Sequence, residues 1–77
     1  MTENQKFIEP GDIGDYAGKL VRYECYPHFD SAVGRVNWNE EERDWVIEAI
    51  EPYRRYFIEQ GISTYIAIEN SVCMWET

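Results

Sequence analysis

The sequence predicts a single α+β domain in which a small antiparallel sheet of about four strands is covered on one face by a helix. The chain has 77 residues, of which 44% are hydrophobic and 16% aromatic, which suits one small globular core and leaves no room for a second. Two stretches alternate with the period of a strand, and a central stretch has the period of a helix. The expected order of elements is therefore ββαββ, within one domain spanning residues 1–77.

Residues 1–17 are expected to form an irregular N-terminal arm. They are polar, they contain Pro10, Gly11 and Gly14, and they show no sustained hydrophobic period. Phe7 and Ile8 are the apolar pair of this arm that could pack as a short strand.

Two hairpins are predicted on either side of the helix. Residues 18–26 and 32–38 alternate between apolar and polar side chains, which is typical of half-buried strands that pair with each other. The apolar positions of these strands are Val21, Tyr23, Cys25, Val36 and Trp38. Residues 63–69 and 72–76 flank Asn70 and Ser71, and this pattern predicts the second hairpin with a tight turn.

A helix is predicted over residues 40–60. Asn39 supplies an N-cap acceptor, acidic residues occupy the first turn, and Gly61 supplies the left-handed residue that ends many helices. Pro52 lies inside this range, and proline removes one helical hydrogen bond and clashes with the preceding turn. A kink, or two helices meeting near residues 50–51, is therefore expected. One stripe of this helix should pack on the sheet, through Val46, Ala49, Ile50, Tyr53 and Phe57.

Acidic residues would gather on another face of the same helix. At about 100° per residue, five carboxylates fall within an arc of roughly 100°, and these are Glu40, Glu41, Asp44, Glu48 and Glu51. Because like charges four residues apart repel, such a row weakens the helix slightly. It is either a solvated, solubilising face or a row of anionic groups that imitates the phosphates of nucleic acid.

Aromatic residues form a second candidate surface. Three Trp and six Tyr are more than so small a core can hide. On the predicted helix, Trp45 lies at about 140° from Glu40, between the apolar stripe and the acidic face, and Tyr56 falls in the same gap. Exposed Trp and Tyr are typical of interface hot spots, and the alternative is that they form the rim of the core.

Cysteine and histidine chemistry is a minor hypothesis. Cys25 and His28 have a Cys-x-x-His spacing that Cys73 and Asp30 could complete as a zinc site, but a second paired motif is lacking. The same Cys25 and His28 could serve as nucleophile and base only with a cleft and an orienting group. A disulfide between Cys25 and Cys73 is an alternative to two free thiols. No cofactor, bound metal or catalysis is expected.

The net charge of the chain indicates which kind of partner it can bind. Fifteen Asp and Glu against seven Lys and Arg give a net charge of −8, which disfavours direct binding to nucleic acid or to an anionic membrane and favours a basic protein surface. The start of the chain lacks the pattern of a signal peptide, so a cytoplasmic location is expected.

The expected function is binding. The sharpest hypothesis is a phage or mobile-element inhibitor of the anti-CRISPR or anti-restriction type, which blocks a basic nucleic-acid-handling host protein by mimicry of DNA. Its partner-binding residues would be Glu40, Glu41, Asp44, Trp45, Glu48, Glu51 and Tyr56. The alternative is a non-catalytic structural or regulatory subunit that binds a protein through exposed Trp and Tyr, and a homodimer is left open.

Overall fold

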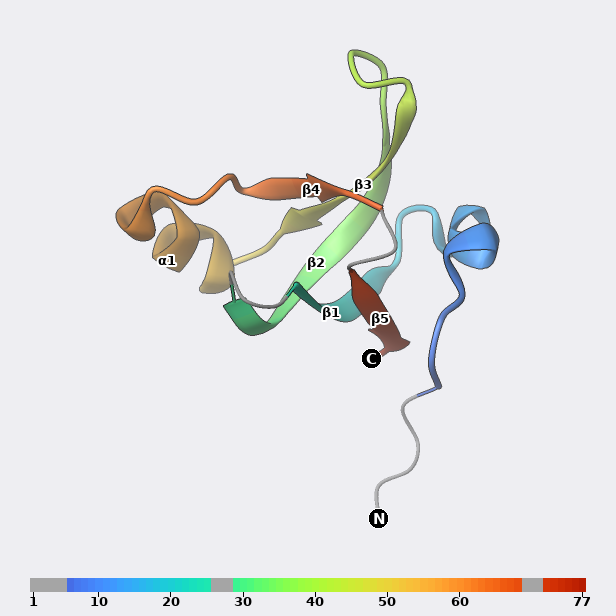
Figure 1. The fold of residues 1–77 in the computed structure, drawn as a ribbon, viewed down its shortest axis with the longest axis horizontal. Helices are drawn as coiled ribbons and strands as arrows, with labels where there is room; N and C mark the ends of the chain where they lie inside the picture. Colours follow the sequence, from blue (N-terminus) through green and yellow to red (C-terminus); the bar gives the residue numbers. More distant parts are fainter. Residues whose placement is uncertain (1–5, 26–28, 69–71) are drawn as a thin grey trace.

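The computed structural model describes residues 6–25, 29–68 and 72–77, and it forms an α+β fold with a five-stranded antiparallel sheet (Figure 1). The elements in chain order are the 3₁₀ helix η1 (Pro10–Tyr16), β1 (Leu20–Cys25), β2 (Phe29–Asn39), β3 (Asp44–Ala49), α1 (Tyr53–Gln60), β4 (Tyr65–Ala67) and β5 (Cys73–Glu76). The strand order across the sheet is β4-β3-β2-β1-β5. The predicted fold class is confirmed, whereas the predicted order ββαββ with four strands is wrong because an additional strand, β3, precedes the helix.

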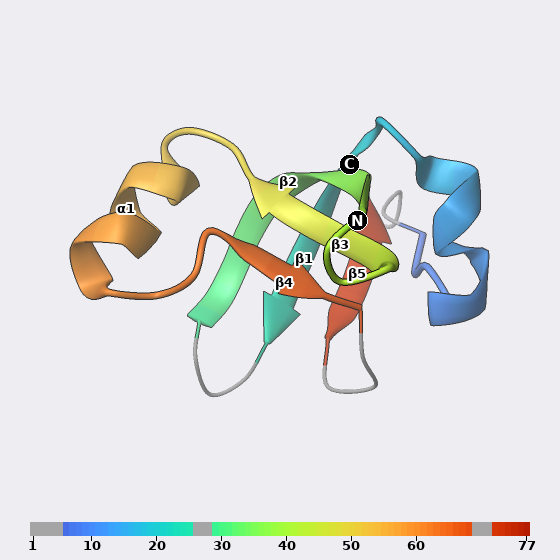
Figure 2. The same ribbon diagram turned by 90° about the horizontal axis from the view of Figure 1, so that it is seen from above.

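The long strand β2 is the centre of the sheet. It pairs with β1 along its first part and with β3 along its second part, and Gly34 pairs with Val21 on one side and Ala49 on the other. A Cβ atom placed on Gly34 would lie 2.6 Å from the carbonyl oxygen of Glu48. The absence of a side chain at Gly34 therefore permits the close approach of β3. The sheet is strongly twisted, so that β4, at one edge, lies at an angle to β1 and β5 on the other side of β2 (Figure 2).

The core lies on one face of this sheet and is closed at both ends. The inner face carries the buried side chains of alternate strand residues, namely Val21, Tyr23, Cys25, Ala32, Val36, Ile47, Ala49 and Met74. At one end Ile8 and Ile13 cover the core, and at the opposite end Phe57 of α1 does so (Figure 2). Phe7 and Ile8, the apolar pair of the arm that could pack as a short strand, contact β5 through an isolated bridge between Phe7 and Trp75 and a hydrogen bond from the Ile8 N–H to the Met74 carbonyl. However, residues 10–16 form η1 instead of an irregular arm.

The predicted helix over residues 40–60 is wrong in its first half. Residues 44–49 form β3, because Trp45 and its β-branched neighbours Val46 and Ile47 favour strands and pair with β2. Pro52 does not kink a longer helix but precedes the first residue of α1. The predicted end is confirmed, since α1 stops at Gln60 and Gly61 adopts the left-handed conformation with φ 76°.

The predicted second hairpin is also wrong. β4 and β5 lie at opposite edges of the sheet, and β5 pairs with β1. In this pairing Glu24 stands opposite Cys73, so the Cys73 side chain lies on the outer face while Cys25 lies in the core. Both thiols are free, and a disulfide between them is excluded by their opposite orientation. The predicted turn at Asn70 and Ser71 lies outside the described residues.

Each edge of the sheet is protected in a different way. On β5, residues 6–8 add main-chain hydrogen bonds, from Ile8 N–H to the Met74 carbonyl at 2.9 Å and from Glu76 N–H to the Lys6 carbonyl at 2.8 Å. On β4, the Ser63 hydroxyl donates to the carbonyl of Tyr65 at 2.9 Å and accepts from its N–H at 3.4 Å. The N–H and carbonyl of Tyr65 point away from β3, so Ser63 satisfies these two outward groups of β4 without a further strand.

Candidate protein-binding site

The β2–β3 hairpin projects from the rest of the molecule (Figure 1). Trp38 pairs with Trp45 and Asn39 with Asp44, and a four-residue turn, residues 40–43, joins the two strands. We define residues 38–45 as the hairpin tip. Its projection makes it accessible to a partner without any rearrangement of the core.

Side chains of the hairpin tip hold the turn. The Asn39 Oδ1 atom accepts a hydrogen bond from the Glu42 N–H at 2.8 Å, and Asp44 Oδ1 accepts one from the Trp45 N–H at 2.8 Å. Arg43 has φ 53°, a left-handed conformation that is strained for a residue with a side chain. The chain reverses at Arg43, and this reversal prevents the predicted helix from starting at Asn39.

The hairpin tip concentrates negative charge. Its four carboxylates are exposed and belong to Glu40, Glu41, Glu42 and Asp44. Arg43 is its single cation, so four acids less one base leave a net charge of −3 within residues 40–44. Within residues 6–25, 29–68 and 72–77, the ion pairs join Glu51 to Arg54 and Arg55 and do not involve the hairpin tip, which leaves its charges available to a partner.

Two tryptophans form the base of the hairpin tip. The rings of Trp38 and Trp45 meet edge to face, with centroids 5.4 Å apart and planes at 79°. Trp45 packs against the core and against η1, where a Cβ atom on Gly14 would lie 3.5 Å from the Trp45 ring. Trp38 is 47% exposed. An exposed indole whose orientation is held by a second indole is therefore placed beside the carboxylates.

The seven predicted partner-binding residues fall into two groups in the structure. Glu40, Glu41, Asp44 and Trp45 meet at the hairpin tip. The prediction that all five carboxylates share one helix face is wrong, because the residues before Pro52 form a turn and a strand. The three residues that lie elsewhere are Glu48, Glu51 and Tyr56.

These three residues are in different surroundings. Glu48 is about 13 Å further along β3 than Asp44, stands opposite Arg35 and accepts a hydrogen bond from Asn37 Nδ2 at 3.2 Å. Glu51 contacts Arg54 at 3.6 Å and Arg55 at 3.9 Å, so its charge is offset. Tyr56 is exposed on α1, at the end of the sheet opposite η1 (Figure 2).

The predicted set lacked one of the two tryptophans and one of the four carboxylates of the hairpin tip. Trp38 and Glu42 join it only once residues 39–44 are recognised as a turn between two paired strands. The signal is present in the sequence, because Trp38 and Trp45 symmetrically flank the segment Asn39–Asp44. Paired aromatics at the two ends of a short polar segment are typical of a hairpin.

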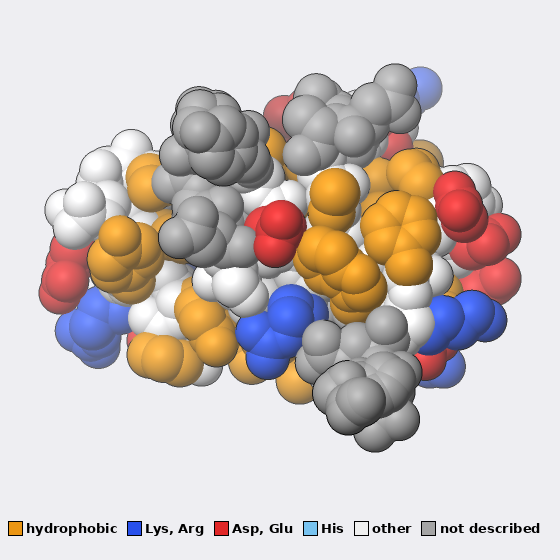
Figure 3. Space-filling view, turned by 60° about the horizontal axis from the view of Figure 1, so that its bottom comes forward, with side chains coloured by type: hydrophobic (Ala, Val, Ile, Leu, Met, Phe, Trp, Pro, Cys, Tyr) orange, Lys and Arg blue, Asp and Glu red, His pale blue; other side chains and the backbone are white. Residues whose placement is uncertain are grey.

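A second aromatic pair lies elsewhere, where the arm meets β5. Phe7 is 45% exposed, and its ring meets that of Trp75 edge to face at 6.1 Å. Arg22 stands opposite Trp75 in the sheet. On the face shown in Figure 3, hydrophobic side chains are exposed beside both basic and acidic ones. This mixture contrasts with the mainly acidic hairpin tip.

The described residues give no support to the metal hypothesis. No group of three or more His, Cys, Asp or Glu side chains within residues 6–25, 29–68 and 72–77 is arranged to hold a metal ion. His28, which the zinc and nucleophile hypotheses require, lies outside those residues.

Within the described residues, no helix is long and apolar enough to cross a membrane.

Neither a protein-family model, nor a curated protein, nor a solved structure matches this chain.

Proposed function

We propose that this chain is a small, non-catalytic inhibitor that inserts its hairpin tip into the basic groove of a nucleic-acid-handling protein. The observation that carries the proposal is the local charge of the hairpin tip, with four exposed carboxylates and one cation next to exposed Trp38. Closely spaced carboxylates on a projecting element substitute for phosphates in a groove lined by Lys and Arg. The Trp38 indole then supplies the apolar contact that charge alone does not.

The proposed setting is that of a phage or mobile-element protein acting in the host cytoplasm against CRISPR or restriction machinery. Small size, net charge of −8 and an acidic projection are compatible with this role. In this version of the hypothesis, mimicry of DNA is carried by a turn instead of by a helix face. Glu48, Glu51 and Tyr56 are not required for it.

The experiment compares two charge-matched triple variants. The tip variant carries Glu40→Gln, Glu41→Gln and Asp44→Asn, and the control variant carries Glu9→Gln, Asp12→Asn and Asp15→Asn. All six residues are exposed, and both variants lose three negative charges. Each protein is immobilised, exposed to source-cell lysate at increasing salt, and washed with duplex DNA. Bound proteins are then identified by mass spectrometry.

If the proposal is right, the wild type and the control variant retain a basic nucleic-acid-handling protein, and the tip variant does not. Salt and duplex DNA should each release that protein from the wild type. If the tip variant captures the same protein as wild type, mimicry by the hairpin tip is wrong. Equal partial losses from both variants would assign the binding to net charge.

A structural or regulatory subunit is the second candidate function, and the exposed aromatic pairs favour it. For such a subunit, Trp38→Ala or Trp75→Ala should abolish capture of the partner, while the tip variant and added salt should change little. The same capture experiment therefore separates the two functions.

A further inference from the structure

Four residues on neighbouring strands stand opposite one another and form a row across the outer face of the sheet. Leu20 of β1 pairs with Arg35 of β2. Arg35 pairs in turn with Glu48 of β3, and Glu48 pairs with Tyr65 of β4. Paired residues of a sheet point to the same face, and the next residue of β1, Val21, points into the core. We call these four outward-facing residues the cross-strand row.

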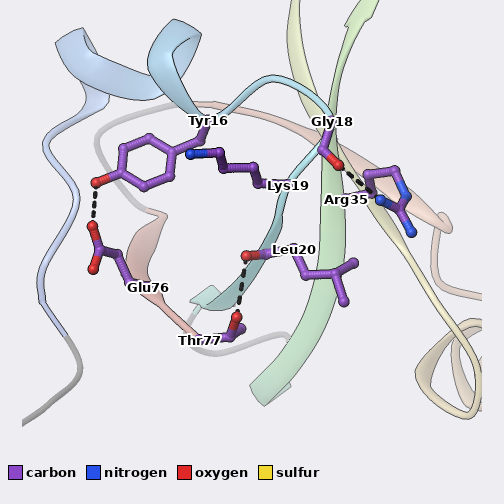
Figure 4. A pocket seen from close by; sticks show the side chains of 7 residues that line it. All are labelled: Tyr16, Gly18, Lys19, Leu20, Arg35, Glu76 and Thr77. Carbon is purple, nitrogen blue, oxygen red and sulfur yellow. Dashed lines mark hydrogen bonds between the residues drawn. The ribbon is translucent and has the colours of Figure 1, made fainter.

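The cross-strand row is accessible to another molecule. Its two charged members are exposed, and its other two members are half-buried. Figure 4 shows Leu20 and Arg35 on one side of β1. Tyr16, Lys19 and Glu76 lie on the other side of that strand (Figure 4). The row therefore belongs to a surface separate from the contacts that η1 makes with the end of β5.

The two charges of the row are held in place by neutral groups. Arg35 Nη1 donates to the Gly18 carbonyl at 2.7 Å, and Glu48 Oε1 accepts from Asn37 Nδ2 at 3.2 Å. Although Arg35 and Glu48 stand opposite each other, they are not among the ion pairs formed within residues 6–25, 29–68 and 72–77. Each charge is thus oriented in advance without being neutralised by the other, which lowers the entropy cost of an intermolecular contact.

The order of chemical types along the row is its own complement. From β1 to β4 the row reads apolar, basic, acidic and aromatic, over three strand spacings or about 14 Å. A two-fold axis parallel to β2 and β3, passing between them, would place Arg35 of one copy on Glu48 of the other. The same axis would place Leu20 on Tyr65. Both contacts then occur twice, as in any isologous interface.

Charge also limits which surface of this protein can meet a second copy. Each chain carries a net charge of −8, so two copies repel each other except where the local charge is balanced. The cross-strand row is neutral, whereas residues 40–44 carry a net charge of −3. On α1, Glu51 is already paired with Arg54 and Arg55 within the chain. The row is therefore the better surface for contact between copies.

We propose that two copies of this chain associate face to face through the cross-strand row and form a closed two-fold dimer. Packed sheets lie about 10 Å apart, a gap that an Arg and a Glu side chain reaching from opposite sheets can bridge. Each copy uses its row once, so the contact closes at two chains. The hairpin tips are not part of the row, so the dimer presents two of them and the proposal is independent of their function.

Sedimentation velocity over roughly a hundredfold range of concentration tests the proposal, because dimer formation follows mass action. The wild type should pass from monomer to dimer. Arg35→Glu and Glu48→Arg should each weaken dimerisation about tenfold or more, since like charges then meet across the axis. The double variant Arg35→Glu with Glu48→Arg restores opposite charges at both contacts and should dimerise within about threefold of wild type. Circular dichroism checks that each variant is folded.

Two controls separate this interface from net charge and from the hairpin tip. Arg54→Glu changes the net charge as much as Arg35→Glu does, on exposed α1, and should weaken dimerisation much less. The tip variant should dimerise at least as well as wild type. A wild type that stays monomeric throughout, a folded double variant as weak as the single ones, or equal weakening by Arg54→Glu would each overturn the proposal. Loss of the dimer in the tip variant would also overturn it, by placing the interface at the hairpin tip.

Discussion

Trp38 and Trp45 face each other across the β2–β3 hairpin, and only Trp45 is anchored in the core. Trp45→Ala should therefore lower the free energy of unfolding by about 3 kcal/mol, because it removes a large packed side chain beneath η1. Trp38→Ala should lower it by only about 1 kcal/mol, the value of an aromatic pair, while abolishing partner binding. Urea unfolding of both variants measures the difference. Equal destabilisation would mean that Trp38 is a core residue and not a contact residue.

Replacing Gly34 tests the tightest point of the sheet. Gly34→Ala places a methyl group near the Glu48 carbonyl and Ile47 Cγ2. The Glu48 carbonyl belongs to the backbone of β3 and cannot move independently of the sheet. We expect a loss of about 1–3 kcal/mol in urea unfolding. Gly11→Ala is the matched control, since a Cβ atom at Gly11 has no neighbour within 4 Å. A neutral Gly34→Ala would show that β2 and β3 can separate without cost.

Replacing Arg43 by glycine should raise both the stability of the protein and its affinity for a basic partner. Arg43→Gly relieves the left-handed conformation of the turn and should stabilise the protein by about 0.5–1 kcal/mol. It also removes the single cation of the hairpin tip, so affinity for a basic partner should rise, most clearly at low salt. Thermal unfolding and a binding isotherm provide the two measurements. Weaker binding by Arg43→Gly would contradict a purely anionic role for the turn.

Alkaline pH should destabilise the fold through two tyrosines. Burial raises the pKa of Tyr23 above its usual value, and the hydrogen bond to Glu76, with burial and nearby carboxylates, raises the pKa of Tyr16. A folded-state pKa above the unfolded value adds stability that is full below the unfolded pKa, about 10 for tyrosine, and is lost as the pH rises through the folded pKa.

The free energy of unfolding should therefore respond little to these two groups up to about pH 9 and should fall above pH 10. Tyrosinate absorbance should show that fewer than six tyrosines ionise at pH 11 until the protein unfolds. In Tyr23→Phe, the alkaline loss should become shallower. A pH response unchanged by this substitution would assign the loss to other groups.

The sequence predicted those parts of the fold that depend on local alternation and on backbone conformation. The buried face of β1, with Val21, Tyr23 and Cys25, follows directly from its period of two. The end of α1 follows from Gly61, because glycine adopts positive φ without steric cost.

The candidate site was placed on the wrong element for a physical reason that Asn39 illustrates. Its side chain bonds to the Glu42 N–H, which is the bond that an N-cap makes in the first turn of a helix, so the local signal was present. Residues 44–49 nevertheless form a strand because they pair with β2. Ile47 is buried opposite Val36, and the chain turns back at Arg43. The pairing of β3 with β2 depends on contacts between strands and not on the local helix signal at Asn39. In the same way, the local turn signal between β4 and β5 does not reveal that β5 pairs with β1.

The contact between Ser63 and Tyr65 at the edge of β4 affects how this protein behaves at high concentration. An unprotected edge strand is a template for polymerisation, in which each added chain exposes the same edge again. Here an incoming chain must first displace both bonds of the Ser63 hydroxyl, for a strand only three residues long. Residues 6–8 occupy β5 at the other edge. Fibre formation through either edge is therefore disfavoured, so the protein should remain monodisperse at the high concentrations that one-to-one binding of an abundant partner, as in the proposed function, would need.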